Sequence, residues 1–329
     1  MAVFYHEADV NPALILGLKV GVIGYGSQGH AHALNLRDSG VDVRVGLYAG
    51  SPSWVKAEQA DFTVVPTSEL TQWADVLMFC TADVPMSAIY QADVEPYLRP
   101  GQTLLFAHGF NILYKLITPP PNVNVAMVSP KGPGPGLRAQ FLDGKGLAAL
   151  VAVHQDFTGL AQELAMSYAW GIGSARAGIL MTTFKEETET DLFGEQSVLC
   201  GGIPELIKAG FDTLVRAGYQ PEVAYFECLH EAKLITDLLY QGGLTAMRQR
   251  ISDTAEWGGF TAGPQVINAE SRAAMETLLE RIQDGSFTRE WIAENESGLP
   301  RMRRFREEER SLAVEDVGRA VRSQLPTLG

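Results

Sequence analysis

The sequence predicts an α/β protein in which a doubly wound parallel sheet is followed by an all-helical domain. Between residues 19 and 181, short apolar runs alternate with segments of helical periodicity, which is typical of repeated β-α-β units. Beyond residue 182 the strand pattern stops, and apolar residues recur three and four positions apart. We therefore expect a sheet domain at residues 1–181 and a helical domain at residues 182–329.

The elements of the first domain can be placed in order. Each expected strand is a short, mostly apolar run bounded by glycine, proline or polar turn residues, and each expected helix opens at a serine, threonine or proline. Strands are predicted at residues 20–24, 41–46, 62–65, 75–80, 103–107, 123–128 and 148–153, with residues 174–178 extending the sheet. Helices are predicted at residues 27–39, 53–59, 67–73 and 85–91.

The second domain is predicted to be helical throughout. Its apolar residues follow the three-to-four spacing that buries one face of a helix. Helices are predicted at residues 204–217, 222–240, 244–252, 269–284, 288–294 and 301–309. The last of these mixes arginine with glutamate, so we interpret it as a solvated helix face rather than a binding tail.

Composition argues against two classes of main partner. The chain has 329 residues and a formal net charge of −13, which disfavours nucleic acid and anionic membranes. The longest apolar runs, such as residues 146–153, are too short to cross a bilayer. Cys80, Cys200 and Cys228 lack zinc-site spacing, so we expect buried free thiols in a reducing compartment. The expectation is a cytoplasmic protein that acts on a small molecule.

A glycine-rich turn follows the first predicted strand and opens the first helix. Its residues are Gly24, Tyr25, Gly26, Ser27, Gln28 and Gly29. This G-x-G-x-x-G pattern in a strand-turn-helix context is the fingerprint of a Rossmann-type dinucleotide site. The glycines permit a tight turn and a close approach to the pyrophosphate, whose charge the helix start favours. We predict that these six residues bind a nicotinamide cofactor.

The end of the second predicted strand bears on which cofactor is preferred. Sites that select NAD carry an acid there, about 20 residues beyond the glycines, to bind the ribose hydroxyls. Residues 43–53 contain no acid, whereas Ser51 and Ser53 offer hydroxyl groups to a 2′-phosphate. A plain turn with a serine helix cap is the alternative. The loop therefore predicts a preference for NADP(H).

Two pairs of acids share one spacing in the second domain. Asp191 and Glu195 lie four residues apart, and Glu227 and Glu231 repeat that spacing 36 residues later. Residues four apart share a helix face, so the two carboxylates of each pair should project from the same side of a helix. Carboxylates without cysteine or histidine partners suit Mg²⁺ or Mn²⁺. Solvated acids on exposed faces are the alternative.

The acids also fall on apolar stripes. Leu199 follows Asp191 and Glu195 on one face, and Leu234 follows Glu227 and Glu231 on another. We therefore expect all four carboxylates to be buried, and buried carboxylates must be paired, protonated or bound to metal.

At this point the chain resembles the ketol-acid reductoisomerases, also called acetohydroxyacid isomeroreductases, in their short bacterial class I form. The resemblance covers nearly the whole chain and is carried by six motifs in order. They are GYGSQGHAH at 24–32, AHGFN at 107–111, PKGPG at 130–134, FKEETETDLFGE at 184–195, YFECLHE at 225–231 and ISDTAE at 251–256.

The resemblance implies the reaction and the architecture of the site. A 2-hydroxy-2-keto acid, 2-acetolactate or 2-aceto-2-hydroxybutyrate, would isomerise by alkyl migration and be reduced by NADPH to the 2,3-dihydroxy acid of valine and isoleucine synthesis. The helical domain would be knotted. Two Mg²⁺ ions would be held by Asp191 and Glu195 of one subunit and by Glu227 and Glu231 of another. The protein would therefore be at least a homodimer.

Further residues receive roles on the same basis. His108 and Lys131 follow predicted strands at the edge where such folds place ligands, and they are candidates for proton relay and charge stabilisation. Glu195 is a catalytic candidate as well as a ligand. The resemblance places Ile251 and Ser252 at the substrate. Gly134 is placed at the cofactor.

Three departures from the family pattern leave the exact activity open. Tyr48 stands where relatives often carry arginine, which weakens the phosphate site and leaves NADH possible. Pro135 and residues 80–85 also differ. These changes are compatible with a paralogue that performs the same chemistry on a related 2-hydroxy-2-keto acid. Two competing hypotheses are a metal-independent NADP hydroxyacid dehydrogenase and a non-catalytic nucleotide sensor.

Overall fold

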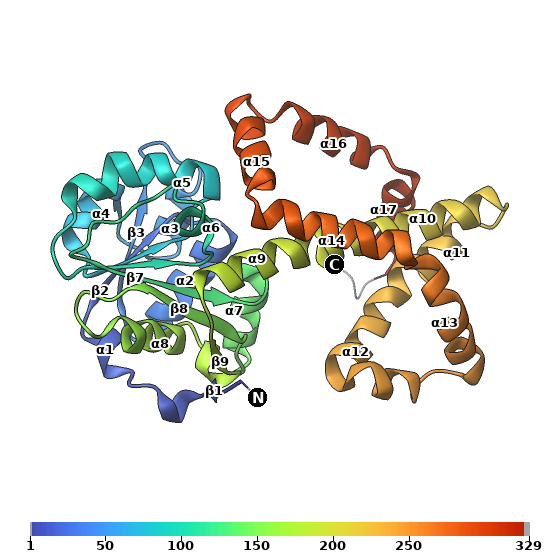
Figure 1. Cartoon of the computed structure of the whole chain (residues 1–329), viewed down its shortest axis with the longest axis horizontal. Helices are drawn as coiled ribbons and strands as arrows, with labels where there is room; N and C mark the ends of the chain where they lie inside the picture. Colours follow the sequence, from blue (N-terminus) through green and yellow to red (C-terminus); the bar gives the residue numbers. More distant parts are fainter. Residues whose placement is uncertain (1, 326–329) are drawn as a thin grey trace. The chain divides into compact units, whose positions relative to one another are not determined.

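The computed structural model describes residues 2–325 and divides the chain into two compact units (Figure 1). The first unit is Met1–Thr190 and the second is Asp191–Gly329. The division falls inside helix α9 (Phe184–Gly194).

A nine-stranded sheet forms the centre of the first unit, in the order β1-β9-β8-β7-β6-β5-β2-β3-β4. The strands are β1 (Phe4–Tyr5), β2 (Lys19–Ile23), β3 (Asp42–Leu47), β4 (Val64–Pro66), β5 (Val76–Phe79), β6 (Thr103–Phe106), β7 (Asn124–Pro130), β8 (Ala149–Gln155) and β9 (Ile179–Met181). The strands from β4 across to β7 are parallel, as predicted. The prediction of a wholly parallel sheet is wrong, because β8 runs antiparallel to β7 and β1 antiparallel to β9.

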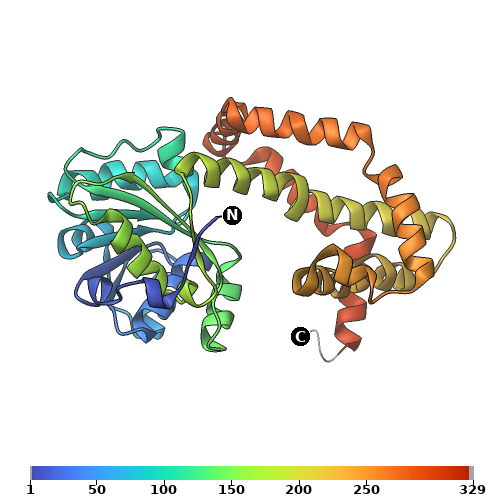
Figure 2. The same ribbon diagram turned by 60° about the horizontal axis from the view of Figure 1, so that its bottom comes forward.

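Helices cover both faces of this sheet (Figure 2). They are α1 (Ala13–Leu16), α2 (Ser27–Asp38), α3 (Trp54–Gln59), α4 (Thr67–Trp73), α5 (Asp83–Ile89), α6 (Phe110–Leu113), α7 (Gly134–Leu142) and α8 (Ala161–Gly171). The sheet separates two apolar cores. Along β5, Val76 and Met78 pack into one core, and Leu77 and Phe79 into the other. A strand buried on both faces shows a continuous apolar run, which is the pattern that predicted it.

The predicted extension of the sheet at residues 174–178 is wrong. Ser174–Arg176 forms a single 3₁₀ turn, and the edge strand β9 begins only at Ile179. Gly173 and Gly178 flank the turn with φ angles of 87° and 131°, which interrupt an extended strand. Helix α8 was not predicted because nearly all of its residues are buried, so it shows no polar face.

The second unit consists of helices, as predicted. They are α10 (Gly202–Arg216), α11 (Pro221–Tyr225), α12 (Glu231–Arg248), α13 (Asp253–Val266), α14 (Ala269–Gln283), α15 (Ser286–Glu296), α16 (Pro300–Arg310) and α17 (Ala313–Gln324). The predicted break before residue 244 is a kink inside α12 at Gly243, where φ is 73°. A small core of Phe211, Ala224, Tyr225, Val314 and Val321 joins α10, α11 and α17. The knotted path stays a prediction.

The prediction that all four acids are buried is wrong for a single chain. Glu195, Glu227 and Glu231 are exposed and Asp191 is half-buried. The apolar residues beside them face solvent too, since Leu199 is 60% exposed and Leu234 is 48% exposed. One helical unit therefore leaves these stripes uncovered, and the periodicity identified an apolar face without identifying what covers it.

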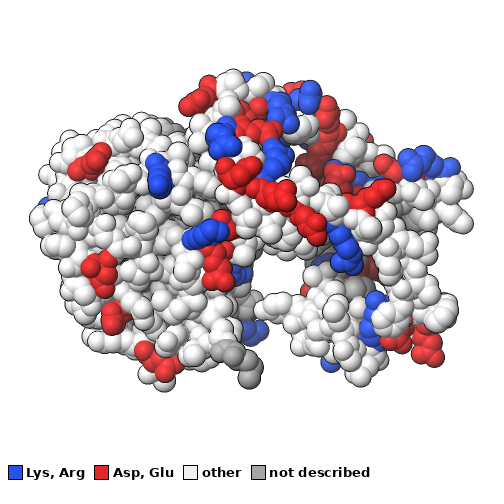
Figure 3. Space-filling model, viewed as in Figure 1, with Lys and Arg blue, Asp and Glu red and all other residues white. Residues whose placement is uncertain are grey.

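Charged side chains on the face seen in Figure 3 gather over α14, α15 and α16, with both signs side by side. Glu290 of α15 pairs there with Arg281 and with Arg301. Residues 301–310 are almost all exposed, which agrees with a solvated helix face. None of the described helices combines the length and the apolar character that crossing a membrane requires. Cys200 is exposed and Cys80 and Cys228 are half-buried, so the prediction of three buried thiols is wrong, although all three are free.

Candidate functional site

The glycine-rich turn connects β2 to α2 at the carboxyl edge of the parallel strands. Gly24 has a φ of 96°, a left-handed conformation that favours glycine. A Cβ atom on Gly29 would lie 2.1 Å from the carbonyl oxygen of Gly24, so the helix can pack this close to the turn only without a side chain. A Cβ on Gly26 would meet nothing within 4 Å. The turn is therefore tight on its inner side and open where a ligand would approach.

Several polar atoms around this turn fit a cofactor. Tyr25 Oη, Gln28 Oε1, Thr81 Oγ1 and Asn111 Oδ1 are buried and hydrogen-bond to no described residue. Buried polar atoms usually have a partner, in the protein or in a ligand. Thr81 and Asn111 follow β5 and β6, the two strands next in the sheet after β2. The strand ends around Gly24 thus present the unpaired groups that a dinucleotide would engage.

The loop after β3 holds the residues predicted to select the cofactor. Tyr48 is 64% exposed, whereas Ser51 is 8% exposed. Ser51 Oγ accepts from the Ser53 amide at 3.3 Å, so its remaining role toward a phosphate is to donate its hydroxyl proton. Ser53 is half-buried at the start of α3. Gly134 begins α7, where a Cβ would lie 1.8 Å from the Ser27 carbonyl oxygen, so it packs directly on the start of α2.

A buried carboxylate, Glu187 of α9, joins the ends of β6 and β7. Lys131 Nζ lies 2.8 Å from its Oε1, and His108 Nδ1 lies 3.2 Å from its Oε2. Ser129 Oγ donates to Oε1 at 2.7 Å, and the Gly109 amide donates to Oε2 at 3.2 Å. The structure therefore brings His108 and Lys131 together, as their strand-end positions predicted, through an acid that was not predicted.

The ionisation of Glu187 follows from these contacts. Burial alone raises the pKa of the carboxyl group, but the hydrogen bonds and positive charges of His108 and Lys131 outweigh it and lower the pKa to about 2. Glu187 is therefore a carboxylate at neutral pH. It favours a protonated Lys131 and fixes the orientation of the His108 ring through Nδ1.

Glu187 carries a sequence signal beyond the two acid pairs. It lies four residues before Asp191, which itself lies four before Glu195, so the three acids occupy successive turns along α9 and its end. Acids at positions i, i+4 and i+8 are the pattern that identifies Glu187 from sequence.

The second unit carries the two predicted acid pairs. Asp191 is in the last turn of α9 and Glu195 follows its end, while Glu227 and Glu231 lie at the junction of α11 and α12. Among the described residues, no three of these four carboxylates approach within 4.8 Å of one another in one chain. Their carboxylate oxygens are the donors that a hard divalent cation prefers.

The predicted substrate residues Ile251 and Ser252 lie just before α13. Ser252 is the cap of that helix, and its Oγ accepts from the Ala255 amide at 3.2 Å. The hydroxyl is exposed and retains its proton for donation. Capping and ligand binding are therefore compatible at this residue.

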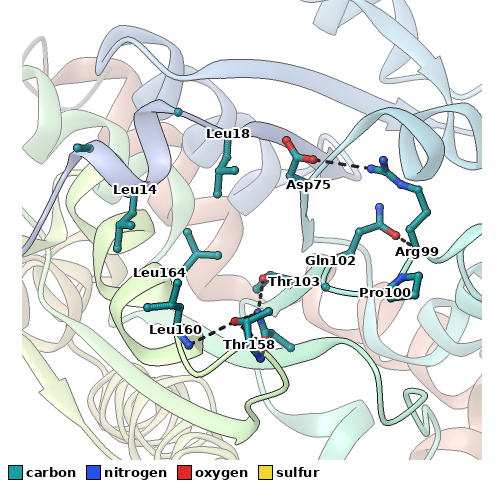
Figure 4. Close-up of a pocket in the computed structure, with 14 residues that line it drawn as sticks. Leu14, Leu18, Asp75, Arg99, Pro100, Gln102, Thr103, Thr158, Leu160 and Leu164 are labelled. Carbon is teal, nitrogen blue, oxygen red and sulfur yellow. Dashed lines mark hydrogen bonds and ion pairs between the residues drawn. The ribbon is translucent and has the colours of Figure 1, made fainter.

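A cavity of about 550 Å³ opens at the opposite, amino edge of the same strands (Figure 4). Four leucines line one side: Leu14, Leu18, Leu160 and Leu164. On the other side Arg99 donates to the Ala74 carbonyl at 2.7 Å and lies 3.8 Å from Asp75, and Gln102 donates to backbone carbonyls. Ligands of doubly wound sheets bind at the carboxyl edge, so this cavity is not the candidate site.

We expect acid to remove stability that Glu187 contributes. Its folded pKa of about 2 lies below its ordinary value of 4.5, so the stabilisation is complete above about pH 4.5 and is lost as the pH falls toward 2. The difference corresponds to about 3 kcal/mol, since a tenfold change in proton affinity is about 1.4 kcal/mol. In urea unfolding, the free-energy deficit of Glu187→Gln relative to wild type should shrink between pH 7 and pH 3. Glu163→Gln, at an exposed position, serves as control, and a deficit independent of pH would contradict the assignment.

Family models match both halves of the chain. Residues 14–178 match the family model described as acetohydroxy acid isomeroreductase, NADPH-binding domain. Residues 184–327 match the model described as ketol-acid reductoisomerase, C-terminal domain.

Individual relatives give the same result. The chain is 54% identical to a ketol-acid reductoisomerase (NADP(+)) of Saccharopolyspora erythraea, over 97% of this chain and 96% of that protein. It matches the structure of an NADH-preferring ketol-acid reductoisomerase from an uncultured archean at 42% identity, with a TM-score of 0.96 and coverage of 98% and 99%. A Cupriavidus necator semialdehyde dehydrogenase NAD-binding protein, at 18% identity and a TM-score of 0.62 over 81% and 99%, shares only the fold. The chain therefore belongs to the ketol-acid reductoisomerase family.

Proposed function

We propose that the protein converts 2-acetolactate or 2-aceto-2-hydroxybutyrate to the corresponding 2,3-dihydroxy acid by alkyl migration and reduction with NADPH, within valine and isoleucine synthesis. The observation that carries the proposal is the buried Glu187, which holds His108 and Lys131 at the strand ends beside the glycine turn. The 54% identity to an enzyme of that name over nearly the whole chain supports it.

The cofactor site is assigned to the carboxyl edge of the sheet. Gly24 to Gly29 would hold the pyrophosphate, with Gly134 packed against the same helix start. Tyr48, Ser51 and Ser53 would surround the adenosine ribose. NADPH, when bound, supplies the hydride for the reduction. Thr81 and Asn111, with their unpaired buried oxygens, would orient the remainder of the cofactor.

The metal site is assigned to the four carboxylates of the second unit. Asp191 and Glu195 from one subunit, with Glu227 and Glu231 from a partner, would hold two Mg²⁺. Two such ions, when bound, act as Lewis acids on adjacent substrate oxygens, as an alkyl shift between neighbouring carbons requires. Carboxylates on rigid helices offer the hard oxygen donors that Mg²⁺ prefers.

Proton handling and charge are assigned to residues of the first unit. Glu187 engages His108 Nδ1, so we assign Nε2 to proton transfer. Lys131 keeps its charge beside Glu187 and would stabilise negative charge on a substrate oxygen. Glu195 would serve both as a metal ligand and as an acid–base group. Ser252 and Ile251 would contact the substrate carboxylate end, with the Ser252 hydroxyl as donor.

We propose a homodimer, and the exposed apolar side chains of the helical unit support it. Large apolar side chains on α10, α12 and α13 face solvent in one chain, including Leu206, Leu244, Trp257 and Phe260. Large exposed apolar residues of this kind are typical of protein–protein interfaces. A partner that covers these faces would also supply the second acid pair. We further propose a cytoplasmic location, because the three cysteines are free.

Removing one metal ligand should abolish isomerisation. Asp191→Asn or Glu227→Gln should lower the rate of NADPH oxidation with 2-acetolactate by more than tenfold, and a tenfold loss is about 1.4 kcal/mol of barrier. NADPH affinity should stay near wild type, because the glycine turn is untouched. EDTA should abolish wild-type turnover and added Mg²⁺ should restore it. Turnover that is indifferent to EDTA would favour the metal-independent dehydrogenase instead.

Shared sites should permit complementation. Mixing inactive Asp191→Asn and Glu227→Gln subunits should restore part of the activity, since each hybrid dimer regains one intact site. Recovery should require subunit exchange, which native mass spectrometry of isotope-labelled chains can follow. Verified exchange without recovery would show that each chain builds its own site. A mixture of two Asp191→Asn preparations is the control.

Position 48 should tune the cofactor preference. NADPH is expected to be preferred, yet by less than in relatives with arginine, because Tyr48 supplies no charge and a charge-assisted hydrogen bond is worth about 1.5–3 kcal/mol. Tyr48→Arg should therefore raise the NADPH to NADH ratio of kcat/KM by more than tenfold. Ser53→Asp should lower it through repulsion of the 2′-phosphate. A ratio that neither substitution moves would place the phosphate elsewhere.

A further inference from the structure

Among the described residues of the helical unit, two turns hold one residue more than an α-helical turn, and each contains one acid of one pair. The first covers Glu195–Leu199, where the Cys200 amide donates to the Glu195 carbonyl at 2.9 Å. The second covers Phe226–His230, where the Glu231 amide donates to the Phe226 carbonyl. These i→i+5 bonds define π turns, which are rare and frequent at functional sites. A third π turn, Tyr90–Val94, belongs to the first unit and carries neither pair.

The extra residue changes the directions in which the carboxylates project. In an α-helix four residues turn through about 400°, so the second side chain overshoots the first by about 40°. In a π turn the same four residues fall short of a full turn. Glu227 lies within the π turn and Glu231 is the first residue of α12. Because the overshoot of an α turn and the shortfall of a π turn have opposite signs, we infer that the two side chains leave this junction in more similar directions than an α-helix would give them.

The first π turn requires the two glycines that follow it. A Cβ on Gly201 would lie 2.0 Å from the Gln196 carbonyl oxygen, and one on Gly202 would lie 2.3 Å from the Ser197 carbonyl oxygen. Each carbonyl belongs to a residue of the π turn, five positions earlier in the chain. Because both are backbone atoms, neither can rotate away as a side chain would. Alanine at either position would force the turn to change.

The second π turn packs against a third glycine. A Cβ on Gly210 of α10 would lie 3.1 Å from Cys228 Sγ and 3.7 Å from its Cβ. Cys228 is half-buried at the middle of the turn, between Glu227 and Glu231. The absence of a side chain on Gly210 thus allows the Cys228 side chain to pack against α10. The start of α10 and its middle therefore accommodate both unusual turns.

Building on the proposed function, we propose that Gly201, Gly202 and Gly210 are positioning residues for the metal site. They permit the π turn that begins at Glu195 and the π turn that separates Glu227 from Glu231. They would touch neither metal nor substrate. Their effect is on the direction of the carboxylates, and so on divalent-cation affinity.

The test measures Mn²⁺ binding by the full-length protein without substrate, from the electron paramagnetic resonance signal of the free ion. Gly201→Ala should weaken Mn²⁺ binding at least tenfold, since losing the support of a ligand typically costs about 10- to 100-fold in affinity. Gly136→Ala is the matched control, because a Cβ there meets only the Pro133 side chain at an ordinary 3.8 Å. NADPH binding, measured in parallel, should not change in either variant.

A substitution cycle keeps the proposal testable if Gly201→Ala fails to fold. Gly210→Ala should weaken Mn²⁺ binding about three- to tenfold, within the lower range for supporting residues. Cys228→Ala in the same chain should restore it, because the atom at 3.1 Å is removed. Folded Gly210→Ala protein with wild-type Mn²⁺ affinity, or no recovery in the double variant, would overturn the proposal. Glu227→Gln distinguishes a failure of this proposal from a failure of the proposed metal site. If Glu227→Gln leaves Mn²⁺ binding intact, the assignment of the metal site itself is wrong.

Discussion

The burial of one ionised carboxylate, Glu187, constrains the rest of the catalytic half. A charge inside a protein is tolerated only when opposite charges and hydrogen-bond donors surround it. Here a lysine, a histidine, a hydroxyl group and a backbone amide converge on its two oxygens. These donors come from the ends of two neighbouring strands, so the carboxylate requires β6, β7 and α9 to meet in one arrangement. The placement of His108 and Lys131 is thus a consequence of pairing one buried carboxylate.

Local sequence determined much of the sheet but not the direction of every strand. The apolar runs located most of the strands, and the glycine turn located the start of α2, because burial and φ angles act on a few adjacent residues. No comparable signal showed that β8 enters antiparallel to β7. A helix lies between those strands, which is the usual sign of a parallel crossover. Tertiary packing decided the direction.

The candidate site residues that directly follow a strand were predictable from the sequence. His108 and Lys131 follow strands, and strand ends converge at one edge whatever else the protein does. The acid pairs were visible as spacings, but the prediction that they are buried is wrong for one chain, since Leu199 and Leu234 lie on faces that one chain leaves open. The π turns were hidden for another reason. A continuous apolar stripe tolerates one inserted residue, so the 3.6-residue period conceals the insertion at Phe226–His230.

The position of Glu187 on α9 limits how the cofactor-binding half can be separated from the chain. A fragment that stopped at Met181, the end of β9, would contain every strand and the whole glycine turn. It would nevertheless lack the Glu187 carboxylate that His108 and Lys131 contact. The last strand of the sheet ends at Met181, but the carboxylate that pairs with His108 and Lys131 belongs to Glu187, on the following helix. As a unit of recombination between enzymes, this half therefore extends into the first turns of α9.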